Sequence, residues 1–346
     1  MTWRMPAETA PHDRVWMAFP VGGYTLGDHA DSAHEARRTW AAVAHAVAEF
    51  EPVRMVVDPA ERAVARRYLS AEIEVLEAPL NDSWMRDIGP SFVHDDTGQL
   101  GAVDWIFNGW GGQDWAVWDH DSKIGRFVAD AAGAIGVSSA LVNEGGGIHV
   151  DGAGTVLATE SVQLDSGRNP GATRASVEAE LRRTIGAEHV VWLPRGLTRD
   201  QERFGTRGHI DMVAALPSPG TILLHAQNDP GHPDYPLTRE FRALLADAHD
   251  AAGRSFTIID LPAPAVLRDD EGFVDYNYVN HLVVNGGVIA CSFGEERADA
   301  LARDVLAAAY PGRRVVSVDA RPLFARGGGI HCITQQQPSR PAAAPA

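Results

Sequence analysis

The sequence is poor in cysteine and has no long apolar run. Only two of its 346 residues are cysteines, Cys291 and Cys332, which is too few for a disulfide framework. No Cys-x-x-Cys or His-x-x-x-His spacing indicates a metal site. No stretch reaches the roughly 18 to 20 apolar residues of a membrane span, and the first residues do not resemble a secretory signal. We therefore expect a cytoplasmic protein with no membrane partner, no metal and no cofactor.

Positive charge is also scarce. The chain has 30 Lys and Arg residues against 46 Asp and Glu residues, and its formal net charge is −16. This excess repels nucleic acid and anionic lipid and favours cationic partners, although solubility alone accounts for it in most acidic cytoplasmic proteins. We therefore expect no nucleic-acid partner. With 45% hydrophobic residues, a chain of this length can bury a large core.

An internal repeat is present. The string "GGGIH" occurs twice, at Gly145–His149 and Gly327–His331, and "GTRGHID" is a related variant that contains His209 and Asp211. The three histidines lie 60 and 122 residues apart, and Asp87 of "NDSWMRDIGP" precedes the first of them by 62. A unit of about 61 residues therefore fits the chain five times, as expected of a repeat architecture.

The coarse secondary structure agrees with this period. Apolar residues at helical spacing alternate with short β-branched runs, such as "TVLATESVQL" from Thr155, and "VVNGGVIA" predicts a hairpin that turns at Asn285-Gly286. Each unit then has a few strands and one helix, and such units bury their apolar faces best in a closed ring with the helices outside. We predict one α/β domain over residues 1–338 and a disordered tail over residues 339–346. The predicted helices are 33–50, 60–69, 122–132, 173–185, 238–252 and 297–310.

Several polar motifs have both an ordinary and a functional interpretation. The charges around Trp84 are compatible with a solvated turn, and Glu144 with a surface acid, but the three glycines beside Glu144 indicate a close backbone approach. A lone histidine is more often structural than catalytic. In a strand, His209 and Asp211 would face the same way. Cys291 lies in an apolar run and is assigned to the core.

Considered together, these residues indicate thiol chemistry on a cation. Cys332 is either a core residue or a nucleophile. Carboxylates at Asp87, Glu144 and Asp211 can grip a guanidinium through paired charge-assisted hydrogen bonds. The same carboxylates raise the pKa of a nearby thiol, so a cationic substrate would resolve the conflict. The expected partner is a small cationic guanidine, and the sequence leaves open whether the chain forms a homo-oligomer.

The motifs resemble those of the agmatine deiminase family, which is related to bacterial peptidylarginine deiminases within the guanidine-modifying pentein superfamily. The resemblance extends from "MPAETAPHDRVWMAFP" to Pro338 and includes "NDSWMRDIGP", "NEGGGIHVDGAGTVLATE", "RNPG", "GHID" and "GGGIHCITQQQP". It implies a five-bladed α/β propeller of ββαβ units without metal or cofactor. It also implies hydrolysis of agmatine to N-carbamoylputrescine and ammonia, a step from arginine to putrescine.

The resemblance assigns roles to particular residues. It implies Cys332 as the nucleophile, which forms a thiouronium intermediate, and His209 as the general acid and base. It implies Asp87 and Asp211 as the residues that hold the guanidinium. The two remaining site residues are Glu144, which steadies the histidine and the substrate, and Trp84, one strand step from Asp87, which forms a pocket wall.

Alternatives remain for the substrate and for catalysis. A peptidyl arginine, free arginine or a specialised-metabolite guanidine would use the same reacting residues with a different pocket. Less favoured alternatives are an amidinotransferase and a pentein module that only binds. The chain departs from the family pattern at Thr9, Phe19, Met212 and Gly329, which leaves the far end of the substrate open. The orientation of Arg86, Arg207 and Arg326, which flank the motifs, is also open.

Overall fold

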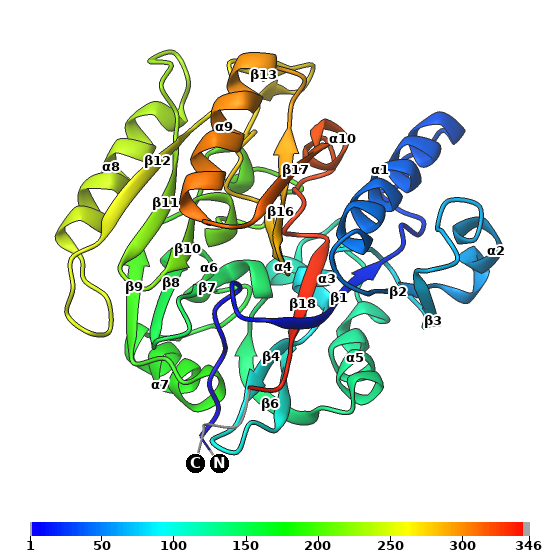
Figure 1. The fold of residues 1–346 in the computed structure, drawn as a ribbon, viewed down its shortest axis with the longest axis horizontal. Helices are drawn as coiled ribbons and strands as arrows, with labels where there is room; N and C mark the ends of the chain where they lie inside the picture. Colours follow the sequence, from blue (N-terminus) through cyan, green and yellow to red (C-terminus); the bar gives the residue numbers. More distant parts are fainter. Residues whose placement is uncertain (1, 342–346) are drawn as a thin grey trace.

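The computed structural model describes residues 2–341 as a mixed α/β protein (Figure 1). Residues 342–346 of the predicted disordered tail lie outside the described part of the chain. At the start of that tail, the backbone N–H of Ser339 donates to the carbonyl of Pro11 (2.8 Å). None of the helices within residues 2–341 combines the length and apolar character needed to span a membrane.

Five sheets share one pairing pattern, in which two antiparallel strands are followed by a strand parallel to the middle one. In the first sheet the last strand of the chain pairs with the first, and an additional parallel strand lies at the edge. The chain end therefore returns to its beginning (Figure 1). The sheets are β18 (Thr334–Pro338), β1 (His12–Ala18), β2 (Val53–Val57) and β3 (Glu74–Glu77); β4 (Ser91–His94), β5 (Leu100–Ile106) and β6 (Ile135–Val142); β7 (Ile148–Val150), β8 (Thr155–Thr159) and β9 (His189–Leu193); β10 (Ala214–Ser218), β11 (Thr221–Ala226) and β12 (Thr257–Pro262); β15 (Leu282–Val284), β16 (Gly287–Ser292) and β17 (Arg314–Asp319).

A helix connects the two parallel strands of every sheet, because parallel neighbours need a long crossover. Each unit is therefore ββαβ, which agrees with the predicted few strands and one helix per period. The five crossover helices are α1 (Ala30–Ala48), α5 (Ile124–Ala132), α7 (Arg174–Ile185), α8 (Asp234–Asp247) and α9 (Glu296–Ala309). The described chain also contains the hairpin β13 (Arg268–Asp269) and β14 (Gly272–Phe273), and the short helices η1 (Pro59–Glu61), α2 (Arg62–Ala65), α3 (Met85–Ile88), α4 (Gly109–Gly112), η2 (Asp121–Lys123), η3 (Gly145–Gly147), α6 (Glu160–Gln163), η4 (Arg199–Gln201), η5 (Ile210–Met212) and α10 (Arg321–Phe324).

The crossover helices bury one face on their sheets. In α1 the buried positions Ala36, Trp40, Val43 and Val47 recur every three or four residues, which places them on one side of the helix. Full burial of a large apolar side chain stabilises the fold by about 1.5 to 3 kcal/mol. The ring of Trp40 also meets the ring of Trp84 edge to face, 5.6 Å between centroids, and thereby supports the segment that precedes α3.

Most predicted helices agree with the structure within a few residues, and the predicted turn at Asn285-Gly286 is confirmed by the pairing of Val284 with Gly287. Three predictions had wrong boundaries. The helix predicted at 60–69 consists of η1 and α2 and ends at Ala65. The helix predicted at 238–252 is α8, which begins four residues earlier, because its first turn accommodates Pro236, and ends five residues earlier, at Asp247. The β run predicted from Thr155 ends at Thr159, where α6 begins; there the Thr159 hydroxyl donates to the Gly208 carbonyl (2.7 Å).

Candidate active site

The motif segments from different units meet at one place. The backbone N–H of Arg86, in α3, donates to the carbonyl of Cys332 (3.1 Å), and the N–H of Gly146, in η3, donates to the Asp87 carboxylate (3.2 Å). From η5, the Asp211 carboxylate accepts a hydrogen bond from His331 (2.8 Å). Residues separated by up to 246 positions are therefore in direct contact.

The two segments that were considered in strand geometry contain short helices instead. His209 precedes η5, and Trp84 precedes α3, so "GHID" is not a strand and Trp84 is not one strand step from Asp87. The reason at His209 is local: the buried Asp200 carboxylate accepts the backbone N–H groups of Gly208 (2.8 Å) and His209 (2.9 Å), which need no strand partner.

His209 lies among carboxylates. Its Nε2 is 3.3 Å from Glu144 Oε2, and its Nδ1 is 3.8 Å from Asp87 Oδ1. Burial alone would lower the pKa of His209, but Asp87, Glu144 and Asp211 outweigh burial and raise it to about 9. His209 is therefore an imidazolium at neutral pH and can serve as a proton donor.

Glu144 is held by Arg168, to which the sequence motifs assigned no role. Arg168 Nε lies 3.0 Å from both carboxylate oxygens of Glu144, and all the side chains of this pair are buried. Burial would raise the pKa of Glu144, but Arg168 and then His209 lower it below its ordinary value. The Glu144 carboxylate is consequently ionised and fixed where it faces the His209 ring.

Asp87 is fixed by two donors. Its Oδ1 accepts from the Gly146 N–H, and its Oδ2 accepts from Trp110 Nε1 (2.9 Å). Burial is the main cause that raises its pKa to about 6, so the carboxyl is largely ionised at neutral pH. Trp110 has a left-handed backbone (φ 55°), and its indole ring lines the pocket beside Cys332.

Cys332 is buried against two polar groups. Its Sγ lies 3.6 Å from Asp211 Oδ2 and 3.2 Å from Asn280 Nδ2. The side-chain carbonyl oxygen of Asn280, Oδ1, accepts the backbone N–H of His331 (2.9 Å). This hydrogen bond fixes the side-chain amide so that its NH₂ faces the sulfur. Burial, followed by Asp211 and Asp87, raises the thiol pKa well above its ordinary value.

Two buried polar atoms of the site have no protein partner. They are Asp211 Oδ1 and His209 Nδ1, and within residues 2–341 neither takes part in a hydrogen bond. Buried polar atoms are nearly always paired in folded proteins. An unpaired acceptor on Asp211, the residue whose other oxygen lies 3.6 Å from the Cys332 sulfur, indicates a place for a ligand that carries N–H donors.

Aromatic side chains form the wall of the pocket. The rings of Trp110 and Trp115 stack (5.4 Å between centroids), and Phe204 stacks on Tyr24 (4.2 Å). Trp84 also lines this pocket, as predicted. The complete lining is Trp84, Asp87, Trp110, Trp115, Phe204, Thr206, Arg326, Gly327 and Cys332. Phe204 and Gly327 also border a second, outer cavity that contains Glu271 and Asp275.

The flanking arginines are occupied elsewhere. Arg86 is buried behind the site against Glu8 (3.5 Å) and Gln336 (2.8 Å). Arg207 pairs with Asp165 (3.6 Å), and Arg326, although it borders the pocket, binds the Thr25 carbonyl (2.7 Å) and Glu35. Cys291 is buried in the hydrophobic core, as predicted.

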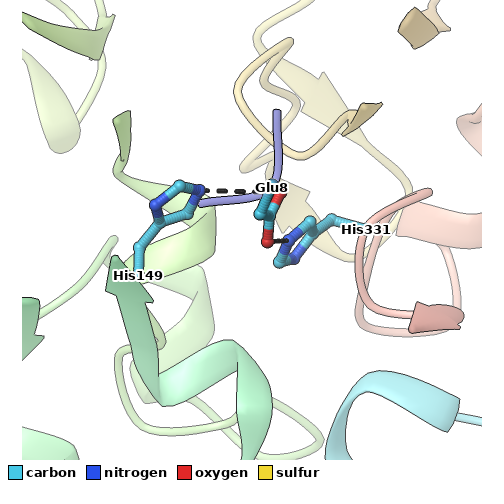
Figure 2. Close-up of side chains that lie close together, drawn as sticks. All are labelled: Glu8, His149 and His331. Carbon is cyan, nitrogen blue, oxygen red and sulfur yellow. Dashed lines mark hydrogen bonds and ion pairs between the residues drawn. The ribbon is translucent and has the colours of Figure 1, made fainter. Parts of the chain in front are cut away.

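A second cluster lies behind Cys332. Glu8, His149 and His331 each place a side-chain atom within 4.8 Å of the others (Figure 2). His149 Nδ1 accepts the Leu216 N–H (3.3 Å), so the ring proton is on Nε2, which faces Glu8 (3.8 Å) and has no free lone pair for a metal. Arg86 further neutralises the Glu8 carboxylate. The geometry therefore favours a charge-paired cluster over a metal centre.

Sequence reasoning missed several residues that hold this site. Asn280 falls in a run that predicts a strand, and Glu8 and Trp110 stand in segments without repeat or spacing signals. Arg168 lies in "RNPG", a motif that contributed to the resemblance but received no role. The resemblance therefore offered a signal for Arg168 and, through "MPAETAPHDRVWMAFP", for Glu8.

Comparisons with known proteins agree with the fold. The model of the Porphyromonas-type peptidyl-arginine deiminase family matches residues 4–338. A relative from Streptomyces coelicolor, provisionally named an agmatine deiminase, is 54% identical over 339 residues, which are 98% of this chain and 99% of the relative. The agmatine deiminase of Stutzerimonas stutzeri is 38% identical and covers 97% of this chain and 95% of its own.

A solved structure extends the comparison to the fold. The agmatine deiminase of Enterococcus faecalis superimposes with a TM-score of 0.91 at 33% identity, over 98% of this chain and 96% of that one. The chain belongs to the Porphyromonas-type peptidyl-arginine deiminase family. It is a hydrolase of C–N bonds in linear amidines.

Proposed function

We propose that this protein is an agmatine deiminase, which converts the guanidine of agmatine to a urea with release of ammonia. The observation that carries the proposal is the unpaired Asp211 Oδ1 close to the Cys332 sulfur. A guanidinium has five N–H donors in a fixed fork and satisfies such an acceptor. In this proposal Asp87 and Asp211 hold the guanidinium through charge-assisted hydrogen bonds, with its central carbon facing Cys332.

The positive charge of the substrate lowers the pKa of the Cys332 thiol, which is high in the free site. Burial and the carboxylates of Asp211 and Asp87 keep the Cys332 thiol protonated in the free protein. A bound guanidinium opposes those carboxylates and lowers the thiol pKa, so the thiol loses its proton to solvent when substrate binds. The reactive thiolate then forms only in the presence of a cation.

The reaction follows from these groups. The Cys332 thiolate adds to the guanidinium carbon, and a neutral tetrahedral adduct forms. The His209 imidazolium gives its proton to one amino group, the C–N bond breaks, ammonia departs and an S-alkylthiouronium remains. Neutral His209 then takes a proton from water, hydroxide forms the C–O bond and the C–S bond breaks. The products are a urea and, after proton exchange with solvent, ammonium.

The named relatives support agmatine among the guanidine substrates, since those from Stutzerimonas stutzeri and Enterococcus faecalis are agmatine deiminases. The second cavity supports a cationic far end. Glu271 and Asp275 line it next to Phe204 and Gly327. Both of its arginines are paired with acids, Arg199 with Glu271 (2.9 Å) and Asp269, and Arg203 with Asp114 (3.8 Å). The product would be N-carbamoylputrescine.

We further propose that residues 1–338 form a single catalytic domain with the shape of a five-bladed α/β propeller. Five ββαβ units with the same strand pairing support this arrangement. The antiparallel pairing of β18 with β1, which joins the end of the chain to its beginning, supports closure of the ring.

The test compares substrates at one pH and ionic strength by ammonia release. We expect kcat/KM for agmatine to exceed that for free arginine by at least about a hundredfold, because a buried carboxylate without a basic partner costs several kcal/mol. Uncharged guanidinoalkanes should lie between the two, and Cys332→Ser enzyme serves as the blank. If arginine or a peptidyl arginine equals agmatine, the substrate assignment is wrong.

A further inference from the structure

One histidine in the cluster behind the site connects two carboxylates. His331 Nδ1 lies 2.8 Å from Asp211 Oδ2, and His331 Nε2 lies 2.8 Å from Glu8 Oε1 (Figure 2 shows the Glu8 contact). We call this arrangement the Glu8–His331–Asp211 bridge. All three side chains are buried.

The bridge requires a charged ring. A neutral imidazole has one N–H, but here both ring nitrogens face carboxylate oxygens at hydrogen-bond distance. Protonation of Glu8 or of Asp211 is the other way to satisfy the geometry. Arg86 argues against a protonated Glu8, because its guanidinium lies 3.5 Å from the same Glu8 oxygen and favours the ionised carboxylate. Burial would raise the pKa of Asp211, but His331, His209 and Arg86 lower it, so this carboxylate is ionised as well. His331 is therefore an imidazolium that donates to both carboxylates.

The bridge also divides the two oxygens of Asp211. Oδ2 accepts from His331 and faces the Cys332 sulfur, whereas Oδ1 is the buried atom that has no protein partner within the described chain. With Oδ2 held, the carboxylate cannot rotate without breaking a charge-assisted hydrogen bond. Oδ1 consequently stays available as an acceptor for the proposed guanidinium.

We propose that His331 is a positioning residue: bridged to Glu8, it orients Asp211 and keeps it ionised for the substrate guanidinium. This inference rests on the proposed function. It gives the N-terminal segment a part in the site through Glu8, which lies 78 residues before the nearest motif arginine, Arg86. His149, although next to Glu8, has no contact with Asp211 in the hydrogen bonds and ion pairs of residues 2–341.

The experiment measures agmatine binding by calorimetry in a Cys332→Ser background, where turnover does not interfere. We expect His331→Leu to weaken binding by about tenfold or more, and His331→Asn, whose amide can replace the Nδ1–H toward Asp211, to recover part of the loss. In an Asp211→Asn background the same His331→Leu change should weaken binding by less than about twofold, because its effect passes through the carboxylate.

His149→Leu is the matched control, because it removes the histidine that ends the other copy of GGGIH. Agmatine binding should change by less than about twofold in this variant. If His331→Leu fails to fold, Glu8→Gln tests the bridge from its other end. We expect this variant to bind agmatine about threefold more weakly. Equal losses with and without the Asp211 carboxylate, or no loss in His331→Leu and Glu8→Gln, overturn the inference. Failure of the Cys332→Ser parent to bind any guanidine contradicts the proposed function instead.

Discussion

The pentapeptide GGGIH occurs at Gly145–His149 and at Gly327–His331, and the two copies end in histidines with opposite electrostatics. His149 accepts a backbone N–H, and burial lowers its pKa to about 4, so it is neutral. His331 donates to two carboxylates that, despite its burial, raise its pKa. Identical local sequence therefore does not set the charge of a histidine; the partners that other segments bring to it do.

The glycines serve a common purpose in both copies. A Cβ on Gly146 would lie 2.4 Å from His209 Nδ1, and a Cβ on Gly328 would lie 2.7 Å from the Trp84 ring and 3.1 Å from the Cys332 sulfur. The distances of 2.4 Å and 2.7 Å are too short for a real side chain. Each copy thus lets the backbone approach a residue of the site, and the repeat reflects this packing need.

The largest expected effect concerns the residue that follows each copy, Val150 after the first and Cys332 after the second. Cys332→Ala should lower kcat for guanidine hydrolysis by at least about 10⁴-fold, because no other group can form the covalent intermediate. Ammonia release measures the loss. The melting temperature should stay within a few degrees of the parent, since alanine fits the buried site. Near-normal turnover in a folded Cys332→Ala enzyme would refute the covalent mechanism.

A second prediction separates the two histidines by pH. The folded pKa of His149, about 4, lies below its unfolded value near 6.5, so the unfolded chain binds a proton first as the pH falls. Stability is lost on acidification from about pH 6.5 to 4, by about 3 kcal/mol in total. His331 has a raised folded pKa, so its contribution is present below about pH 6.5 and lost as the pH rises through that folded value.

Urea unfolding from pH 4.5 to 9 tests these signs. His149→Asn should flatten the acid side of the stability profile relative to the parent, and His331→Asn should flatten the alkaline side. Other groups titrate in the same range, so only the difference between variant and parent is diagnostic. If both variants changed the same limb, the two histidines would not differ in charge, and the bridge would lose its electrostatic basis.

Much of the fold was predictable because its signals are local or periodic. The spacing of Asp87, His149, His209 and His331 indicated five units, and apolar periodicity indicated the crossover helices. Boundaries failed where a tertiary contact decides them, as at Thr159, whose hydroxyl binds the Gly208 carbonyl. The strand expected at "GHID" failed for the same reason, because Asp200 satisfies its backbone.

The candidate site was predictable in part. Its reacting side chains lie in repeated or glycine-rich motifs, and the structure brings Asp87, Glu144, His209, Asp211 and Cys332 together. The residues that hold these side chains in place could not be predicted from local sequence. Asn280 and Glu8 meet the site only after the chain closes on itself, and no spacing relates them to Cys332. Their roles depend on contacts across 52 residues (Asn280 to Cys332) and 323 residues (Glu8 to His331), which local patterns do not encode.

The smallest expected effect concerns the other cysteine, Cys291, which is buried like Cys332 but lies in β16. Burial raises the pKa of Cys291 to about 12, and its Sγ donates to the backbone carbonyl of Asn280 (3.1 Å). Cys291→Ser keeps this hydrogen bond, so turnover should stay within about twofold, and the more polar hydroxyl should cost about 1 kcal/mol, or roughly 2 °C in melting temperature. Ammonia release and thermal unfolding measure both. Because the Asn280 amide contacts the Cys332 sulfur, a tenfold loss of turnover in Cys291→Ser would show that β16 positions the nucleophile through Asn280, and the assignment of Cys291 to the core alone would be wrong.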